Sequence, residues 1–173
     1  LEESFTEAFG FRLTGGRLRW LANLAVRVLG RDDRVEKVRE LGGQLVADMR
    51  NHGAAPVHTG EAAGLNETLG LAESRIEALL AAVVGAADGE EELTRRRKRL
   101  IRSGRSLLEE IQTARLHLSG PSALDLVAWI EMEDGRQPIL KVVPVEVGPV
   151  LEESLWARRT AVLTSATIPM NIV

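Results

Sequence analysis

The sequence predicts a mainly α-helical protein with a small β part, in which an antiparallel helical bundle is followed by α/β segments. Apolar residues recur at helical spacing as far as residue 118. After Ser119 the pattern changes to an alternation of apolar and polar residues, which is typical of a half-buried strand. The chain therefore divides into about 105 residues of helical bundle and about 50 residues of α/β pieces.

Two helices are expected first, separated by Gly30. Residues 17–29 carry apolar residues at helical spacing. Asp33, followed three residues later by Glu36, resembles a capping box with Asp in place of Ser or Thr. We therefore expect a second helix to begin at Asp33. Its apolar face consists of Val35, Val38, Leu41, Leu45 and Met49.

A long helical hairpin is expected next, after a loop over residues 51–60. The fourth helix runs from about Glu90 to Leu118, and its apolar residues follow steps of three and four that suit antiparallel packing. Arg97 and Gly104 interrupt this stripe, so we expect looser packing at the distal end of the hairpin. The matching stripe of the third helix consists of Leu65, Leu69, Ala72, Ile76, Leu79 and Val83.

Strands and one short helix are expected after the bundle. Residues 124–133 alternate apolar with mostly polar side chains, an Asp-Gly pair at 134–135 marks a hairpin, and residues 139–145 form the return strand. A short helix over about 149–157 and a strand over 160–163 complete the pattern. Three strands and one helix cannot bury a free-standing α/β core, so we expect these pieces to need further strands.

Composition and charge narrow the class of protein. Apolar residues make up 45% and charged residues 27%, which excludes a disordered chain, and the net charge of −3 shows no global excess of positive charge. No apolar run approaches the ~18 residues that span a bilayer, so we expect no membrane segment. The absence of cysteine excludes a Cys-ligated site and agrees with the cytoplasmic location that we expect. The three histidines have no metal-ligand spacing, and we expect no metal site.

The most specific motif lies close to the end of the chain. Val-Gly-Pro at 147–149 is followed by an interval of helix length and then by an apolar strand that leads into Thr-Ser-Ala-Thr at 164–167. This arrangement resembles the segment around motif III of superfamily 2 helicases of the DinG/XPD group. There a helix leads into a buried strand that ends in Thr-Ser-Ala-Thr-Leu, and Ile168 replaces that Leu here.

The resemblance extends along the chain in the same order. Leu-Glu-Glu at 1–3 resembles the residues that follow the DEAH box, and residues 14–18 fall where the first motor domain gives way to a helical arch. The resemblance therefore implies three parts: residues 1–14 end one part of motor domain 1, residues 15–120 form the arch domain, and residues 121–173 return to motor domain 1. The antiparallel bundle would thus be inserted in an incomplete RecA-like α/β motor domain.

The resemblance implies a part of an ATP-dependent DNA helicase that translocates on single-stranded DNA with ATP and Mg²⁺. It implies that Thr164, Ser165 and Thr167 couple the nucleotide state to the DNA path, with Ala166 keeping the turn small. Thr167 as the N-cap of a helix near Pro169 is the alternative interpretation. The chain carries no phosphate loop and no DEAH acid, so this segment alone is expected to be inactive. These motifs would lie in the rest of the parent protein, whose remaining motor domains would be partners of this segment. Many relatives hold an iron–sulfur cluster upstream of this segment and some have lost it, so the resemblance does not decide whether the parent holds one.

A basic stripe on the fourth helix is the candidate DNA contact. Seven basic residues lie within 95–105 of an otherwise acidic chain. Four of them share one helical face: Arg95, Arg99, Arg102 and Arg105. Such a stripe could track a phosphate backbone. Ion pairing with Glu91 and Glu92, which lie four residues before two of the arginines, is the alternative.

The tryptophans are further candidates. Trp129 lies on the polar face of its strand, where it could stack on a base, an interaction worth ~1–3 kcal/mol in single-strand binders. We favour a packing role for it under a helix of the motor sheet. Trp20 and Trp156 are expected in the core or in an interface.

A different class of function also fits the helices, namely a non-enzymatic helical-bundle module that binds partner proteins. The paired third and fourth helices could hold a partner helix. This interpretation leaves the strands and the Thr-Ser-Ala-Thr segment unexplained.

Overall fold

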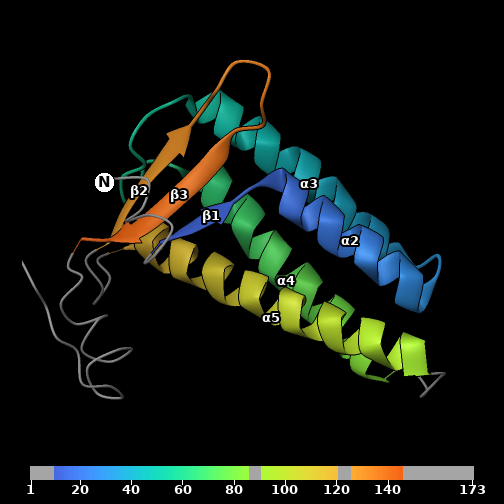
Figure 1. Ribbon diagram of the computed structural model, residues 1–173. Helices are drawn as coiled ribbons and strands as arrows, with labels where there is room; N and C mark the ends of the chain where they lie inside the picture. The colour runs from blue at the N-terminus through green and yellow to red at the C-terminus, as the bar shows by residue number, and fades with distance from the viewer. Residues whose placement is uncertain (1–9, 86–90, 121–125, 146–173) are drawn as a thin grey trace, which may run out of the picture.

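A mainly helical bundle with one small sheet makes up the protein. The computed structural model describes residues 10–85, 91–120 and 126–145. In chain order the elements of these residues are β1 (Phe11–Leu13), α2 (Gly15–Leu29), α3 (Asp33–His52), α4 (Ala63–Gly85), α5 (Glu91–Ser119), β2 (Leu126–Glu131) and β3 (Ile139–Pro144). The hairpins α2–α3 and α4–α5 pack against each other, and the strands lie at one end of the bundle (Figure 1). The expected fold class of helices with a small β part is confirmed.

Helix α3 begins at Asp33 as expected, but its N-cap lies one residue before the Asp33 that the capping-box pattern indicated. Asp32 is the N-cap, and its carboxylate accepts a hydrogen bond from the backbone N–H of Arg34 at 2.8 Å. The capping box of Asp33 and Glu36 is therefore wrong, because Glu36 lies one position too far from the true cap. Hydrogen bonds from the side chain and then the backbone of Arg34 lower the pKa of Asp32 to about 2. The cap therefore keeps its negative charge, which the helix N-terminus favours.

Helices α2 and α3 approach each other at a pair of glycines. A Cβ atom on Gly15 would lie 2.0 Å from the carbonyl oxygen of Gly42, and one on Gly42 would lie 2.6 Å from the carbonyl oxygen of Gly15. The neighbouring Gly43 meets nothing within 4 Å. Of the two adjacent glycines inside α3, only Gly42 is therefore needed for the close contact with α2.

Helices α4 and α5 pack along the apolar stripes expected from their spacing. All six members of the α4 stripe are buried: Leu65, Leu69, Ala72, Ile76, Leu79 and Val83. The expected looseness at Gly104 is wrong, because Gly104 is buried and a Cβ atom there would lie 2.7 Å from Cδ2 of Leu80. The guanidinium of Arg97 donates to the carbonyl oxygen of Val84, near the end of α4. The small residue and the arginine therefore tighten the hairpin.

The sheet has the order β1-β3-β2 with antiparallel neighbours, and β1 was not expected from the sequence. The hairpin turn between β2 and β3 is confirmed, with Gly135 at a φ of 74°. β1 pairs Phe11 with Val142 and Leu13 with Leu140. A third strand is thus supplied by residues that precede the bundle. One face of the sheet packs on the helices, and the buried side chains of this face are Leu13, Ala128, Ile130, Leu140 and Val142.

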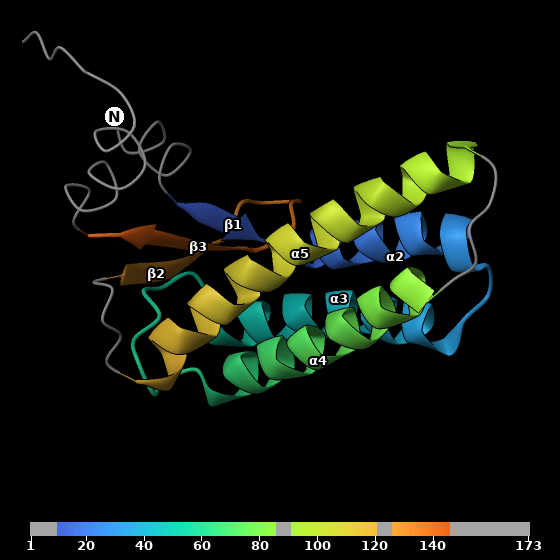
Figure 2. The same ribbon diagram turned by 90° about the horizontal axis from the view of Figure 1, so that it is seen from below.

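The segment between α3 and α4 ties the sheet to the bundle. The backbone N–H of Val57 donates to the carbonyl oxygen of Ala128 at 2.8 Å, and that of Ile130 donates to the carbonyl oxygen of Ala55 at 2.9 Å. The hydroxyl of Thr59 donates to the carbonyl oxygen of His117 in the last turn of α5 at 2.9 Å. The turn from α2 to α3 lies at the opposite end of the bundle, away from the sheet (Figure 2).

An ion pair between a buried lysine and a partly exposed glutamate lies on the other face of the sheet. Lys141 is only 7% exposed, and its Nζ atom lies 2.5 Å from Oε2 of Glu131 and 5.8 Å from the ring centroid of Trp129. We predict that Glu131→Gln lowers the free energy of unfolding by about 2 kcal/mol, because it leaves the buried ammonium without its counter-charge.

Urea denaturation measures this change, and Glu133→Gln is the matched control. Glu133 pairs with Arg136 in the exposed turn, so its loss is expected to change stability by less than ~0.5 kcal/mol. Equal effects of the two substitutions would contradict the assignment of a counter-charge to a buried lysine.

Candidate nucleic-acid interface

The basic side chains of α5 lie on its solvent-exposed face. The opposite side of the helix faces the bundle, with buried residues Leu100, Gly104, Leu107, Ile111, Ala114 and Leu118. The cations of the exposed face are Arg95, Lys98, Arg99, Arg102 and Arg105. The four arginines of the predicted stripe therefore lie where a phosphate backbone could reach them.

Two glutamates in the first turn of α5 form ion pairs with Arg95 and Arg96 and so compensate part of the positive charge. Arg95 lies 3.6 Å from Glu91 and 3.7 Å from Glu92, and Nε of Arg96 donates to Glu92 at 2.8 Å. The hydrogen bond from Arg96 lowers the pKa of Glu92. The ion pairs expected from the spacing are thus confirmed, although such exposed pairs are weak.

Further along α5, three cations have no ion pair within the described part of the chain. Across residues 10–85, 91–120 and 126–145, no carboxylate forms an ion pair with three of the α5 cations: Lys98, Arg102 and Arg105. An anion that approaches this part of α5 would not have to displace a carboxylate partner from any of the three.

Trp20 lies beside this basic surface and is 45% exposed. The guanidinium carbon of Arg99 lies 5.7 Å from its ring centroid, within the range of a cation–π contact. A core position for Trp20 is therefore wrong. The signal was present in the sequence, because Trp20 falls between Leu18 and Leu21, outside the apolar stripe of its helix.

Three adjoining hollows lie along α5, two of them between α2 and α5 and the third lined by residues of α5 alone. Trp20 borders two of them, one of about 370 Å³ that also contains Arg102 and one of about 240 Å³ that contains Arg99 and Arg27. Arg102 and Ser106 also line the third, of about 490 Å³. We call these hollows together the α2–α5 groove. Its basic residues are Arg17, Arg27, Lys98, Arg99, Arg102 and Arg105, and one carboxylate, Glu109, lines it.

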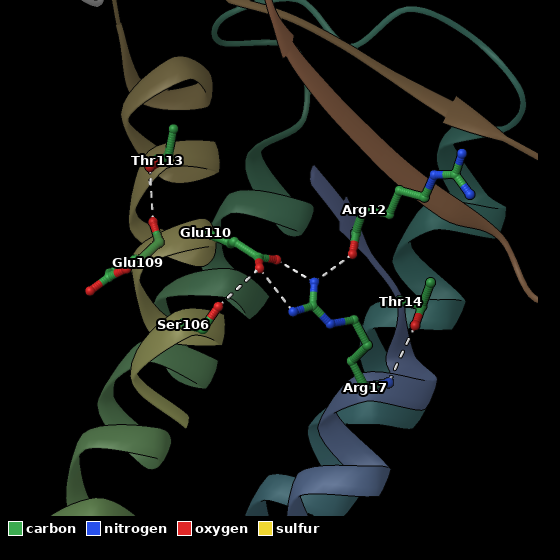
Figure 3. Close-up of polar contacts among 7 residues, drawn as sticks. All are labelled: Arg12, Thr14, Arg17, Ser106, Glu109, Glu110 and Thr113. Atoms are coloured by element: carbon green, nitrogen blue, oxygen red, sulfur yellow. Dashed lines mark hydrogen bonds and ion pairs between the residues drawn. The ribbon is translucent and has the colours of Figure 1, made fainter. Parts of the chain in front are cut away.

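A bidentate ion pair involves Arg17, which lines the hollow of about 370 Å³ (Figure 3). Both terminal nitrogens of Arg17 donate to the carboxylate of Glu110, with Nη2 at 2.9 Å from Oε1. Nη1 also donates to the carbonyl oxygen of Arg12 in β1 at 2.7 Å, and Ser106 lies 3.5 Å from the same carboxylate. The pair therefore joins α2, α5 and β1, and it neutralises Glu110 next to the groove.

Trp129, a predicted site residue that the structure describes, does not line this groove. Trp129 is half-buried in the sheet beside Lys141, whereas the basic stripe occupies the half of α5 that lies away from the sheet (Figure 1). A DNA contact of Trp129 stays a prediction. The motif III candidates lie outside the described residues, and their coupling role stays a prediction too: Thr164, Ser165, Ala166 and Thr167.

The described residues contain neither a metal-binding group nor a membrane-spanning helix. No group of three or more His, Asp or Glu side chains among them could hold a metal ion. None of their helices combines the length and the apolar character needed to cross a membrane.

Comparison with known proteins gave no match, since no protein-family model fits this chain and no curated protein matches it significantly. The resemblance to DinG/XPD helicases therefore rests on the sequence motifs alone.

Proposed function

We propose that the chain is the helical arch of an ATP-dependent DNA helicase resembling the DinG/XPD group, with adjoining segments of its first motor domain. The arch would span residues 15–120, and residues 1–14 and 121–173 would belong to the motor. The observation that carries the proposal is the α2–α5 groove, where Arg102, which forms no ion pair with a described carboxylate, lies beside an exposed tryptophan. Proteins that bind single-stranded nucleic acid combine a basic groove for the backbone with aromatic side chains for the bases.

The topology supports an insertion into a larger domain. β1 leads directly into α2, and β3, which follows the bundle, is the neighbour of β1 in the sheet. The chain therefore enters and leaves the bundle at the same end (Figure 1). This arrangement allows a helical unit to be inserted without separating the strands of its host.

In the parent protein the groove would guide a single strand while the motor moves it. ATP and Mg²⁺ would be bound by other parts of the parent, because this sequence contains neither a phosphate loop nor a DEAH acid. Motif III, with Thr164, Ser165 and Thr167, would couple the two activities.

A non-enzymatic interaction module is the second candidate. The observation that favours it is the exposure of apolar side chains on the α4–α5 hairpin, such as Leu71 and Leu116, the latter 62% exposed. Such residues could contact a partner helix.

Purification of the native protein that contains this segment separates the two functions. The helicase proposal expects a product several times heavier than the 18.9 kDa of this chain, with Mg²⁺-dependent ATP hydrolysis that single-stranded DNA stimulates. A native product near 18.9 kDa that hydrolyses no ATP would contradict the proposal and favour the interaction module.

A further inference from the structure

We infer that Trp20 is a base-stacking residue, against which one base of single-stranded DNA lies in the hollow of about 370 Å³ between α2 and α5. This inference rests on the proposed function and deepens it, because it assigns the base contact to a residue of α2. The sequence motifs gave Trp20 no such role.

Trp20 lines two separate hollows, and Arg99 lines only one of them. Arg99 lies over the indole ring and lines the hollow of about 240 Å³, whereas Trp20 lines the hollow of about 370 Å³ without Arg99. A base in the hollow of about 370 Å³ would therefore contact Trp20 where Arg99 does not line the space. The cation on the indole adds to the positive potential that attracts the strand.

The lining of the larger hollow suits a flat ring with polar edges. Leu21 and Leu107 are buried and form apolar walls, while Ser103 and Ser106 supply hydroxyl groups that can donate to or accept from a base edge. The volume of about 370 Å³ lies within the ~300–1,000 Å³ of small-ligand pockets. The hollow therefore has room for a base.

The charges around the hollow favour a phosphate-linked base over a free neutral ring. Arg102 lines this hollow and the adjoining one, which also contains Lys98 and Arg105. Arg17, which lines the hollow, pairs with Glu110 and compensates its charge, while Glu109 lines the adjoining hollow. A strand whose base lies against Trp20 would place its neighbouring phosphates beside these cations.

Binding of matched oligonucleotides to the full-length protein tests the inference. The probes are a thymidine oligomer and an abasic oligomer of the same length and charge, compared for the natural protein, Trp20→Ala and Trp20→Phe. We expect Trp20→Ala to weaken binding of the thymidine oligomer about tenfold and to leave the abasic oligomer unchanged. Trp20→Phe should recover most of the loss, and the salt dependence should not change, because no charge is removed.

The other possible binding results each contradict either the stacking role of Trp20, the proposed function, or the choice of DNA as the ligand. An equal loss on both oligomers, with unchanged circular dichroism, would make Trp20 a positioning residue for Arg99 and overturn the stacking role. No loss on either, while Arg102→Glu/Arg105→Glu still weakens binding, would overturn the inference and leave the proposed function in place. Loss from neither variant would overturn both. Tighter binding of an RNA oligomer or of a poly-glutamate peptide than of DNA would overturn the assigned occupant.

Discussion

Replacing Arg102 and Arg105 together with glutamate is expected to weaken binding of single-stranded DNA at least about tenfold and to lower the slope of log affinity against log salt by about 1.4. Both side chains are exposed in the α2–α5 groove, and no carboxylate among the described residues pairs with them. Each phosphate contact on a single strand contributes ~0.7 to the slope, so the loss of two contacts gives the expected change. Fluorescence anisotropy at several salt concentrations measures both quantities.

Arg50→Glu/Arg75→Glu is the matched control for this variant. It makes the same change in net charge at exposed positions of α3 and α4, outside the groove. At physiological salt, exposed charges are screened beyond ~8 Å, so the control should bind DNA nearly as well as the natural protein. Equal losses from the two double variants would show a net-charge effect and contradict a contact in the groove. Arg95→Glu alone should have a smaller effect, because Arg95 already pairs with glutamates.

Gly42→Ala is expected to lower the free energy of unfolding by about 2–3 kcal/mol, because the added methyl group has no room. Its Cβ atom would lie 2.6 Å from the carbonyl oxygen of Gly15 and 2.9 Å from Cγ of Arg19. The oxygen belongs to the backbone and cannot rotate away, so α2 and α3 would have to move apart. Thermal unfolding measures the change, with a fall of ~2–4 °C for each kcal/mol in a chain of this size.

Gly43→Ala provides the control for this prediction with the same atoms added one residue later. Nothing lies within 4 Å of the added Cβ, and the residue is exposed in the same helix. Alanine favours the helix over glycine by ~1 kcal/mol, so Gly43→Ala should raise the stability. If the two variants melted at the same temperature, the close contact of α2 and α3 would be wrong.

The helices could be predicted from the sequence because each buries one stripe at helical spacing. Every residue of the expected α3 and α4 stripes is buried in the bundle, although Val46 and Leu80 are buried as well, and the glycine after α2 ends it as expected. The N-cap of α3 was missed by one residue, since Asp32 and Asp33 are chemically equal and only the backbone geometry selects the first. β1 was missed because three residues are too short to show an alternating pattern.

The groove could be predicted only in part. Helical spacing placed the basic residues of α5 on one face, which the structure confirms as exposed. It could not show that α2 lies beside that face, because Trp20 and Arg99 are far apart in the chain and meet only through helix packing. The ion pair of Arg17 with Glu110 has the same origin, since it joins residues from two helices with no common sequence pattern.

Photocrosslinking tests most directly whether single-stranded DNA occupies the α2–α5 groove. A thymidine oligomer carrying a photoreactive base would be bound to the full-length protein, irradiated, and its attachment sites mapped by mass spectrometry. We predict crosslinks at Trp20 in α2 and within residues 98–106 of α5, and their loss in Arg102→Glu/Arg105→Glu. Crosslinks confined to α3 or the exposed face of α4, or unchanged crosslinks in the double variant, would contradict the account.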